Sequence, residues 1–503
     1  MTLTIRLHAA LPETTGADVI ALALTGEDLR TRAVRRRLAA LSGRRLEDEL
    51  KRRRFRAAEG SALVVGPLAA SGRAGRGRRP TSMLVLVGLG AAAEPSRDAW
   101  RRAADQVIVR ARDLGARSAA LGVARPAAVT AAVVGTLAEA ASLASYAFTT
   151  YRVDRDRIRL RRLVLAGVEA RARPVTEALR RGLALGRATN AARAWINTPA
   201  SVLTPAAFAD EARRAAKAAG LAIEVDGPDA IAALGMGALL GVARGSVEEP
   251  RFIRLIYRPK GTPRRRLALV GKGVTFDSGG LSLKTADGME HMKRDMAGAA
   301  AVLGAMVAIA ALRPDVEVRA YMPAAENMPS GSAIKPGDVV RTASGKTIEV
   351  MNTDAEGRLL LADALAIAAR DEPDAIVDIA TLTGAIRTAL GTRVAGVMGN
   401  DPELLRALRA AAERSGERVW ELPLFEGYRA DLTSSVADLR NVATDGHGGS
   451  IHAGLMLREF VGGRPWAHFD IAGVAFADRD LPCTPRGGVG WGVRLLTEWV
   501  TAS

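Results

Sequence analysis

Two short blocks of the sequence bring acidic and basic side chains together at spacings that suit metal chemistry. The candidate ligands and cations of the first block, at 271–300, are Lys272, Asp277, Lys284 and Asp295. The second block, NTDAEGRLLLADAL at 352–365, places Asp354 and Glu356 two residues apart, with Arg358 two residues further on. Carboxylates this close repel each other unless a cation neutralises them. We therefore predict a metalloenzyme.

Four carboxylates among few histidines favour a site with oxygen ligands. Two divalent ions about 3.5–4 Å apart, sharing bridging carboxylates, would neutralise such a cluster. The zinc motif HExxH is absent, and the five histidines show no ligand spacing. His468 falls in a strand pattern and is predicted to be a hydrogen-bonded core residue. Cys483 has no partner pattern for nucleophilic catalysis and is predicted to be structural.

The second block also has a purely structural interpretation. Thr353 and Glu356 have the spacing of a capping box, in which the hydroxyl and the carboxylate close the start of a helix. That interpretation gives no role to Asn352, Asp354 or Arg358. The spacing alone leaves both interpretations open.

The elements around these blocks form an α/β pattern. A strand at 267–276 would deliver Lys272 and Asp277 near its carboxyl end, where α/β sheets place their ligands. The glycines after Ser278 permit a sharp turn there. Asp295 precedes an Ala- and Gly-rich helix. The other predicted elements are strands at 316–326, 375–384 and 466–476, helices at 297–312 and 356–370, and a hairpin turn leading into a strand at 342–350.

A chain of 503 residues exceeds the size at which a single core stops growing, so two domains are expected. The first part predicts strands at 61–70, 82–90 and 150–169, with helices at 95–115 and 126–148. We expect an N-terminal α/β domain over 1–170, a connecting helix over 171–195, and a catalytic α/β domain over 196–503. The catalytic domain should hold a mixed central sheet flanked by helices.

The net charge of +17 comes entirely from the first 200 residues. They hold 36 Lys and Arg against 17 Asp and Glu, whereas the remaining residues hold 35 against 37. Such an excess can bind phosphate backbones. No nucleic-acid motif accompanies it, and the basic runs contain no aromatic residues that stack on bases. A solvated Arg-rich surface is the simpler interpretation, and DNA binding through residues 1–200 is the alternative.

The sequence predicts a cytoplasmic protein without a membrane association. A single cysteine excludes an intramolecular disulfide framework. No basic start followed by an apolar run marks a secretory signal. The longest uncharged stretch, 297–312, is too short and too weakly apolar to span a bilayer.

Both blocks resemble those of the leucine aminopeptidase family of dinuclear metallo-exopeptidases. The same resemblance extends to NTPASVLTP (197–205), PAAENMPSGSAIKPGD (323–338), DIATLTGA (378–385) and WAHFDIAG (466–473). It is close over 190–503 and only architectural over the first 170 residues. It implies hydrolysis of N-terminal residues from peptides with a free N-terminus, by a cytosolic leucyl-type aminopeptidase that assembles as a homohexamer. A DNA-binding accessory or regulatory protein is the alternative, because some bacterial members of the family have that role.

The resemblance also assigns the metal ligands. Asp277 and Glu356 would bridge two divalent ions, most simply Mn or Zn. Lys272 and Asp295 would be the remaining ligands of the exchangeable ion. Asp354 would be the remaining ligand of the other ion. A lysine ligand must be neutral, against an ordinary pKa near 10.4, and only an adjacent dication makes that possible.

The resemblance assigns two catalytic cations and a pocket. Lys284 would polarise the scissile carbonyl, and Arg358 would hold a bicarbonate ion that acts as general base toward the metal-bridging water. The residues that resemble substrate contacts are Met292, Asn352, Thr381, Leu382, Gly384 and Ala472. Ala475 stands where some relatives have methionine, which would widen the pocket for the first side chain.

Overall fold

The structure is a computed structural model that describes residues 3–43, 45–68, 82–91, 94–125, 129–153 and 159–503. The chain divides into two compact units. The first comprises Met1–Arg187 with Asp480–Pro485, and the second comprises Ala188–Arg479 with Arg486–Ser503. The division falls inside the long helix α5 (Arg173–Asn197), in the region where the sequence predicts a connecting helix.

The first unit is built on a six-stranded sheet in the order β1-β6-β5-β2-β4-β3. All pairs are parallel except β3 with β4. The central strand β2 is buried at every position, which explains its uninterrupted apolar sequence VIALAL. The strands are β1 (Thr4–His8), β2 (Val19–Leu24), β3 (Ala62–Pro67), β4 (Met83–Gly88), β5 (Ser118–Val123) and β6 (Arg162–Ala166).

Helices pack against this sheet, and their buried side chains form two separate apolar cores with those of the strands. One core contains residues of α3 (Arg97–Asp113) and α4 (Ala131–Ala144), and the other contains residues of α1 (Arg32–Ser42) and α2 (Arg45–Arg52). The predicted strands at 61–70 and 82–90 correspond to β3 and β4, and the predicted helices at 95–115 and 126–148 to α3 and α4. The strand predicted at 150–169 is much shorter, because β6 begins only at Arg162 and the described residues 150–153 are not in a strand. The loop predicted at 71–80 and part of the segments predicted at 126–148 and 150–169 lie outside the described residues.

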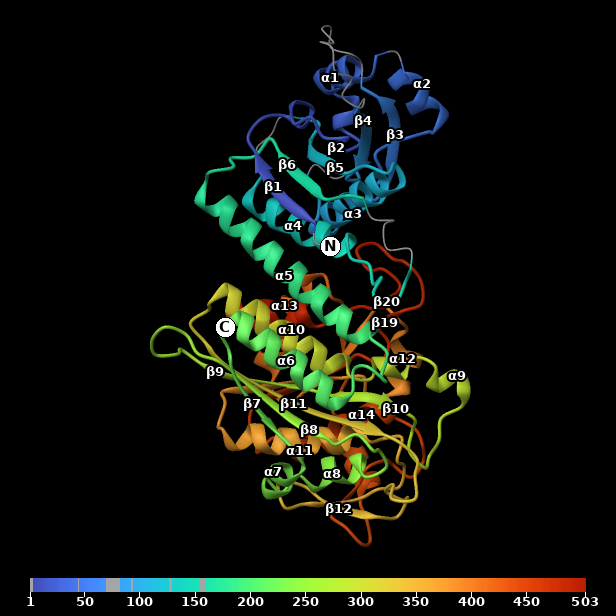
Figure 1. Ribbon diagram of the computed structural model, residues 1–503, viewed down its shortest axis with the longest axis vertical. Helices are drawn as coiled ribbons and strands as arrows, with labels where there is room; N and C mark the ends of the chain where they lie inside the picture. The colour runs from blue at the N-terminus through green and yellow to red at the C-terminus, as the bar shows by residue number, and fades with distance from the viewer. Residues whose placement is uncertain (1–2, 44, 69–81, 92–93, 126–128, 154–158) are drawn as a thin grey trace. The chain divides into compact units, whose positions relative to one another are not determined.

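The second unit is built on a nine-stranded mixed sheet, as predicted (Figure 1). Its order is β16-β15-β18-β14-β9-β11-β8-β7, with β10 paired to β11. The four central strands β18, β14, β9 and β11 are mutually parallel. The strands are β7 (Ala222–Asp226), β8 (Arg251–Tyr257), β9 (Arg266–Gly271), β10 (Gly273–Asp277), β11 (Glu317–Asn327), β14 (Ala375–Ala380), β15 (Ala395–Gly399), β16 (Val419–Glu421) and β18 (Trp466–Asp470).

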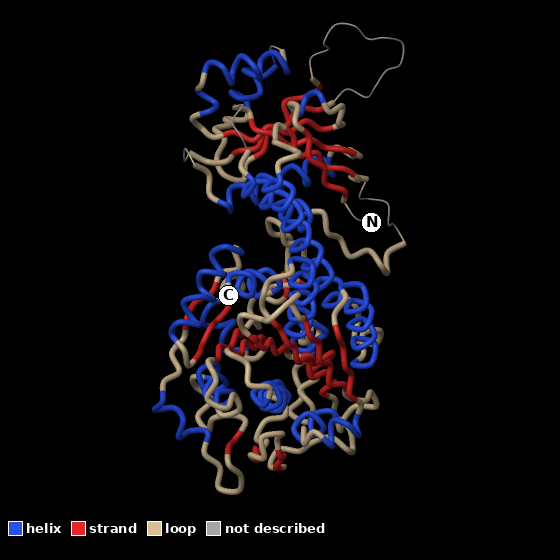
Figure 2. Tube along the Cα trace, turned by 90° about the vertical axis from the view of Figure 1, so that its left-hand side faces the viewer, coloured by secondary structure: helices blue, strands red, loops and turns tan. Residues whose placement is uncertain are grey.

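Helices cover both faces of this sheet (Figures 1 and 2). One layer contains α6 (Pro205–Ala219), α10 (Ala297–Leu312), α13 (Pro402–Ser415) and α15 (Val493–Ala502). The opposite layer contains α7 (Pro228–Ala233), α8 (Gly237–Ala243), α11 (Gly357–Arg370) and α14 (Gly449–Arg458), which share a single apolar core. The predicted helices at 297–312 and 356–370 are α10 and α11. The hairpin turn predicted at 342–350 joins β12 (Val339–Arg341) to β13 (Thr347–Glu349), whose Ile348 and Glu349 also pair with β17 (Leu439–Arg440).

Three predicted strands of the second unit are shorter than the apolar pattern indicates, and one of them, predicted at 375–384, is β14, which ends at Ala380. The segment 267–276 divides at Lys272 into β9 and β10, because β9 pairs with both β14 and β11 whereas β10 pairs with β11 alone. The segment 466–476 ends at Asp470. The chain then turns, with Val474 N donating to Ile471 O at 3.0 Å, before the short strand β19 (Phe476–Ala477), which pairs with β20 (Gly487–Gly488).

Among the described residues, Ala286–Leu312 is the one helical stretch long and apolar enough to cross a membrane by length and composition. It is longer than the 297–312 segment considered from sequence, because short helical turns precede α10. Most of its apolar window, 78%, is buried inside the protein. Burial of this kind is what the core helix of a packed sheet requires.

Candidate active site

The site is formed where the central parallel strands end. Lys272 directly follows β9, Asp277 ends β10, and Thr381 directly follows β14. Asn327 ends β11. Because these strands run in the same direction, their carboxyl ends meet at one edge of the sheet, where α/β proteins bind their ligands.

Two helices begin at the same edge and supply the other acidic groups. Asp295 stands two residues before α10, and Asp354 and Glu356 stand in the loop that leads into α11. The amino end of a helix carries a partial positive charge, which stabilises nearby carboxylates. The loop before α11 thereby places both of its carboxylates among the strand ends.

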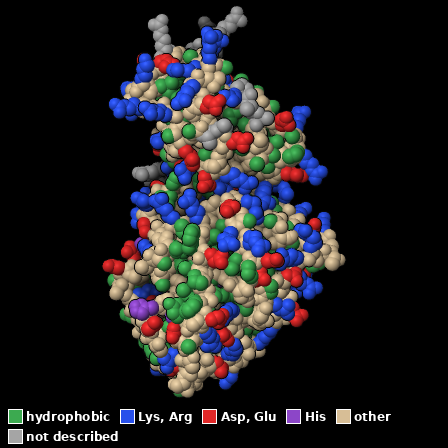
Figure 3. Space-filling view, turned by 180° about the vertical axis from the view of Figure 1, so that it is seen from behind, with side chains coloured by type: hydrophobic (Ala, Val, Ile, Leu, Met, Phe, Trp, Pro, Cys, Tyr) green, Lys and Arg blue, Asp and Glu red, His purple; other side chains and the backbone are tan. Residues whose placement is uncertain are grey.

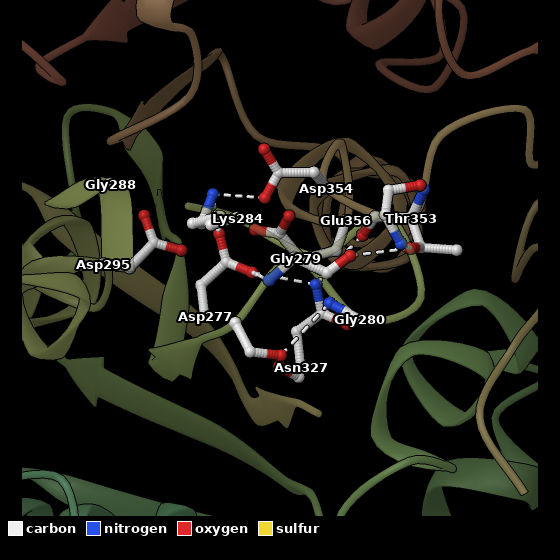
Figure 4. Close-up of polar contacts among 12 residues, drawn as sticks. Asp277, Gly279, Gly280, Lys284, Gly288, Asp295, Asn327, Thr353, Asp354 and Glu356 are labelled. Atoms are coloured by element: carbon white, nitrogen blue, oxygen red, sulfur yellow. Dashed lines mark hydrogen bonds and ion pairs between the residues drawn. The ribbon is translucent and has the colours of Figure 1, made fainter. Parts of the chain in front are cut away.

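The structure brings all five candidate metal ligands and Lys284 together. Figure 4 shows the four carboxylates beside Lys284. Lys272 Nζ lies 2.8 Å from Asp295 Oδ2 and 2.7 Å from Glu356 Oε1. Lys284 Nζ lies 2.8 Å from Asp277 Oδ2 and also pairs with Asp354. Two adjoining clusters result, one around each lysine.

These groups lie almost wholly out of contact with solvent. Lys272, Asp277, Asp295 and Glu356 are buried, and only Asp354 and Lys284 are partly exposed. Burial raises the pKa of Asp277, and burial together with the fields of Asp277 and Asp295 raises the pKa of Glu356. Burial alone would lower the pKa of Lys272 and Lys284. The surrounding carboxylates outweigh burial, so the pKa of both lysines is raised.

The donor set fits a metal ion. One oxygen each from Asp277, Asp354 and Glu356 can lie within 4.8 Å of one another. Glu356 Oε1 and Asp295 Oδ2 are buried and pair with Lys272 Nζ, whereas Glu356 Oε2 is buried and accepts no hydrogen bond from the described residues. Buried carboxylate oxygens without donors are costly, and coordination of a cation removes that cost.

Asn327 supports the acidic cluster and was not identified from sequence. Its Nδ2 donates to Asp277 Oδ1 at 2.8 Å and to Thr353 O at 2.9 Å. Gly279 N donates to the same Asp277 oxygen at 2.9 Å. Asn327 lies in the segment 323–338 that carries the family resemblance, and its place at the end of β11 is the signal that could have identified it.

The turn after Asp277 requires its glycines, as predicted. Gly279 has φ +88° and Gly280 has φ +63°, a region that favours glycine. A Cβ on Gly279 would lie 2.5 Å from Ser282 O and 2.9 Å from Asp354 Oδ1. The turn therefore returns the chain close to the second block.

The capping box does not form. Thr353 Oγ1 donates to Gly279 O at 2.6 Å and accepts from Ser282 N at 2.8 Å, so it binds the first block rather than its own helix. Glu356 is the residue before the helix, but its side chain makes no capping hydrogen bond. The carboxylate instead faces Lys272.

Arg358 is a buried cation beside the acidic cluster. Its Nη1 donates to Asn441 O at 2.6 Å and its Nη2 to Gly449 O at 3.4 Å. Its Nε is buried and has no hydrogen-bond partner within the described part of the chain. Burial lowers the pKa of Arg358 to about 10. A small anion would accept a hydrogen bond from this Nε.

The predicted substrate contacts lie around the same edge. Thr381 O accepts from Lys272 Nζ at 2.9 Å, and Thr381 Oγ1 donates to Asp295 Oδ1 at 2.7 Å. Asn352 Oδ1 accepts from Asp354 N at 2.8 Å. The remaining members occupy a short helical turn (Met292), the loop after β14 (Leu382), the start of α12 (Gly384–Leu390) and the loop after β18 (Ala472).

Three other residues that the sequence singled out, Ala475, His468 and Cys483, are buried. Ala475, expected to widen the pocket, is fully enclosed. His468 is also fully buried, with Nδ1 2.6 Å from Asp378 Oδ1, which confirms its predicted place in the core. Cys483 is buried, and its backbone N donates to Asp105 Oδ1 at 2.8 Å.

A largely buried set of carboxylates and lysines at the carboxyl edge of an α/β sheet is the arrangement of a metal-dependent enzyme. The chain belongs to the cytosol aminopeptidase family, whose catalytic domain matches residues 190–497 and whose N-terminal domain matches residues 20–155. It is therefore a metallo-aminopeptidase, and its substrates are peptides.

Individual relatives agree with this assignment. A probable cytosol aminopeptidase of Geobacter sulfurreducens is 44% identical over 431 residues, covering 85% of this chain and 86% of the relative. The solved structure of the bottromycin maturation enzyme BotP in complex with Mn is 39% identical, with a TM-score of 0.83 over 97% of this chain and 99% of that chain. A mutant of tomato leucine aminopeptidase is 32% identical, with a TM-score of 0.88 over 100% and 97%.

Proposed function

We propose that this protein is a leucyl-type aminopeptidase that uses two divalent metal ions, Mn or Zn. The ions would be held by Lys272, Asp277, Asp295, Asp354 and Glu356. The observation that carries the proposal is the Glu356 carboxylate, which is buried beside Asp277 with one oxygen paired to Lys272 and the other without a hydrogen bond among the described residues. When bound, such ions polarise a carbonyl and lower the pKa of water, which is the chemistry that peptide hydrolysis needs. The relative BotP has been solved with Mn.

The two cations of the site would act on the substrate and on a base. Lys284 is the more exposed of the two lysines, so its ammonium group can reach a scissile carbonyl oxygen and stabilise negative charge as it develops. Arg358 would hold a bicarbonate ion through its unpaired Nε, and such an ion would supply a general base beside the metal ligands. This arrangement would supply the general base that the roles proposed for the described site residues leave unassigned.

Three further properties are part of the proposal. Met292, Asn352, Thr381, Leu382, Gly384 and Ala472 would line the pocket for the first side chain of the peptide. The protein would act in the cytosol, as the names of its relatives imply. It would assemble as a homohexamer, which sedimentation should detect as six times the 52.8 kDa chain.

The test is turnover of aminoacyl amides by metal-free enzyme reconstituted with Mn, Zn, Co or Mg. Lys284→Ala and Arg358→Ala should slow turnover by roughly 10²–10³-fold, the usual effect of removing one group that stabilises the transition state, while retaining metal. Asp354→Ala should instead lose metal, measured by elemental analysis. Lys346→Ala is the matched control, because Lys346 also pairs with a carboxylate, Glu459, at 2.6 Å but outside the site. Normal metal content and rate in Asp354→Ala would refute the ligand assignment.

A second candidate function rests on the uneven charge. All of the positive excess lies in the first 200 residues, and a phosphate backbone would neutralise it. On the face drawn in Figure 3, Lys and Arg side chains are spread over the surface rather than gathered in one patch. Some arginines of the first unit are already paired, such as Arg35 with Glu47 and Arg37 with Glu13. DNA binding therefore stays the alternative and would be non-specific.

A further inference from the structure

Two loops that carry proposed pocket residues start side by side. Residues 381–383 follow β14 and residues 471–475 follow β18, and these two strands are parallel neighbours with Ala380 opposite Asp470. Ile471 N donates to Ala380 O at 2.8 Å, which continues the pairing by one residue. Beyond that point no further strand pairing joins the two loops within the described residues.

Beyond the end of the strand pairing, the carboxylate of Asp470 joins the two loops by hydrogen bonds. Its Oδ1 accepts from the backbone N of Leu382 (3.2 Å), Thr383 (3.4 Å) and Ala472 (3.2 Å). Its Oδ2 accepts from Thr383 Oγ1 at 2.6 Å. Asp470 is fully buried, so the carboxylate makes these four contacts away from water. Hydrogen bonds to an ionised acceptor are about twice as strong as neutral ones.

Each of these contacts ends on a segment with a proposed role in the pocket. Leu382 and Ala472 are pocket residues themselves. Thr383 accepts from Ile386 N at 3.2 Å and so begins α12, whose first residue is Gly384. The carboxylate therefore sets the separation of the two loops and the start of α12.

The same loop is attached to the metal site at its other end. Thr381 binds both Lys272 Nζ and Asp295, as described above. Residues 381–383 thus lie between two fixed points, the metal ligands on one side and Asp470 on the other. A change at Asp470 would move the pocket without removing a metal ligand.

We propose that Asp470 is a positioning residue that sets the width of the pocket for the first side chain of the peptide. It acts through the backbone of Leu382, Thr383 and Ala472 rather than by touching the substrate. The proposal rests on the proposed function, because it takes Leu382, Gly384 and Ala472 as pocket residues.

The experiment compares Asp470→Ala, Asp470→Asn and Asp378→Asn with the unaltered protein. Asp378 is the matched control, because it is an equally buried aspartate on the adjacent strand. Its carboxylate accepts from Trp466 Nε1 at 2.7 Å and contacts His468, and it is not joined to either loop by a hydrogen bond. Asp470→Asn keeps the shape of the side chain and one acceptor oxygen. It should therefore retain part of the substrate preference that Asp470→Ala loses.

Two readouts are needed. The first is kcat and KM for the amides of alanine, leucine, methionine and phenylalanine with Mn-loaded enzyme. Asp470→Ala should change the relative kcat/KM values among these amides about tenfold, mainly through KM, since a pocket discriminates first side chains by about that factor. The second is hydrogen exchange, which should speed up in 381–386 and 471–475. Metal content should stay unchanged.

The outcomes separate this proposal from the proposed function. If the unaltered protein hydrolyses no amide, the proposed function fails, and hydrogen exchange alone decides whether Asp470 fixes the loops. If hydrolysis is normal but Asp470→Ala keeps the same preference profile, or Asp378→Asn alters the profile equally, the role of Asp470 is refuted.

Discussion

Gly357 shapes the metal site by having no side chain. It is the first residue of α11, and Lys272 passes directly over it. A Cβ at this position would lie 2.7 Å from Lys272 Cε and 2.8 Å from its Nζ, closer than real Cβ contacts. Because the atoms in the way are the end of a flexible side chain, an alanine would displace the Lys272 amine rather than unfold the helix.

Gly357→Ala should therefore lower metal affinity and turnover while leaving the melting temperature nearly unchanged. Alanine is favoured over glycine in helices by up to about 1 kcal/mol, which offsets part of the strain. Metal titration and thermal melting measure the two effects separately. Gly227→Ala is the control, since Gly227 directly precedes α7 and its Cβ would meet nothing within 4 Å. Unchanged metal affinity in Gly357→Ala would show that Lys272 is not a ligand.

Among single residues, the sequence identifies the charged candidate ligands better than the residues that position them through hydrogen bonds. Asp354 and Glu356 could be predicted to face a cation because their spacing forces two like charges together. Spacing alone does not identify Asn327 or Asp470, because each acquires its role through partners more than 20 residues away in the sequence. For Asn327, its position at a strand end is the one signal that the sequence offered. The predicted capping box does not form for a similar reason. The Thr353 hydroxyl binds Ser282 N and Gly279 O, which are distant in sequence, in place of an amide of its own helix.

Among the elements, α8 depends on a carboxylate from another helix. Asp363, inside α11, accepts from Leu239 N at 2.8 Å and from Ala343 N at 2.7 Å. The first of these amides lies in the opening turn of α8, where backbone donors have no partner within the helix. Asp363 is fully buried, and burial raises its pKa to about 7 although the backbone hydrogen bonds oppose the shift.

This shift gives the stability of the protein a pH dependence of definite sign. The pKa of Asp363 is higher in the folded protein than the value near 3.9 expected in the unfolded chain, so the folded state binds more protons between those values. Its contribution is complete below about pH 4 and is lost as the pH rises to about 7. The loss is on the order of a few kcal/mol, at 1.36 kcal/mol per pKa unit.

Thermal melting between pH 5 and pH 8 measures this contribution. The melting temperature of the unaltered protein relative to Asp363→Asn should fall as the pH rises across this range. Asp374→Asn is a useful comparison, because Asp374 also accepts a backbone N–H, from Arg266 at 2.7 Å, but is exposed. Equal pH dependence of the two variants would contradict a specific role for Asp363.

Element types could be predicted from apolar patterns, but element ends could not. The run LALVGKGVTF contains no polar residue other than Lys272 and Thr275, and no turn signal in it marks the change from β9 to β10. That change depends on which strands lie alongside, since β14 pairs with β9 and not with β10. The same holds for 466–476, where the turn after Asp470 is fixed by hydrogen bonds to the loop after β14.

For the whole molecule, the distribution of charge separates the two candidate functions. The peptidase site requires only the second unit, which holds every proposed ligand, whereas DNA binding would require the basic first part of the chain. The two functions can therefore be tested independently in the full-length protein by replacing surface cations far from the ligands in sequence.

If the basic part binds DNA, the affinity for a plain duplex should fall steeply between 50 and 200 mM salt, because each neutralised phosphate contributes about −0.9 to the slope of log K against log salt. Replacing the exposed Arg36 and Lys51, on α1 and α2, by serine should reduce that slope by roughly 2 units in a mobility-shift titration. Replacing Arg213 and Arg214 on α6, each paired with an acidic neighbour, removes the same charge from the second unit and should leave the slope unchanged. Aminoacyl amide hydrolysis should be the same in both double variants. A duplex that fails to bind at 50 mM salt, or a slope that responds equally to both pairs, would assign the arginine excess to solvation alone and leave peptide hydrolysis as the function of this chain.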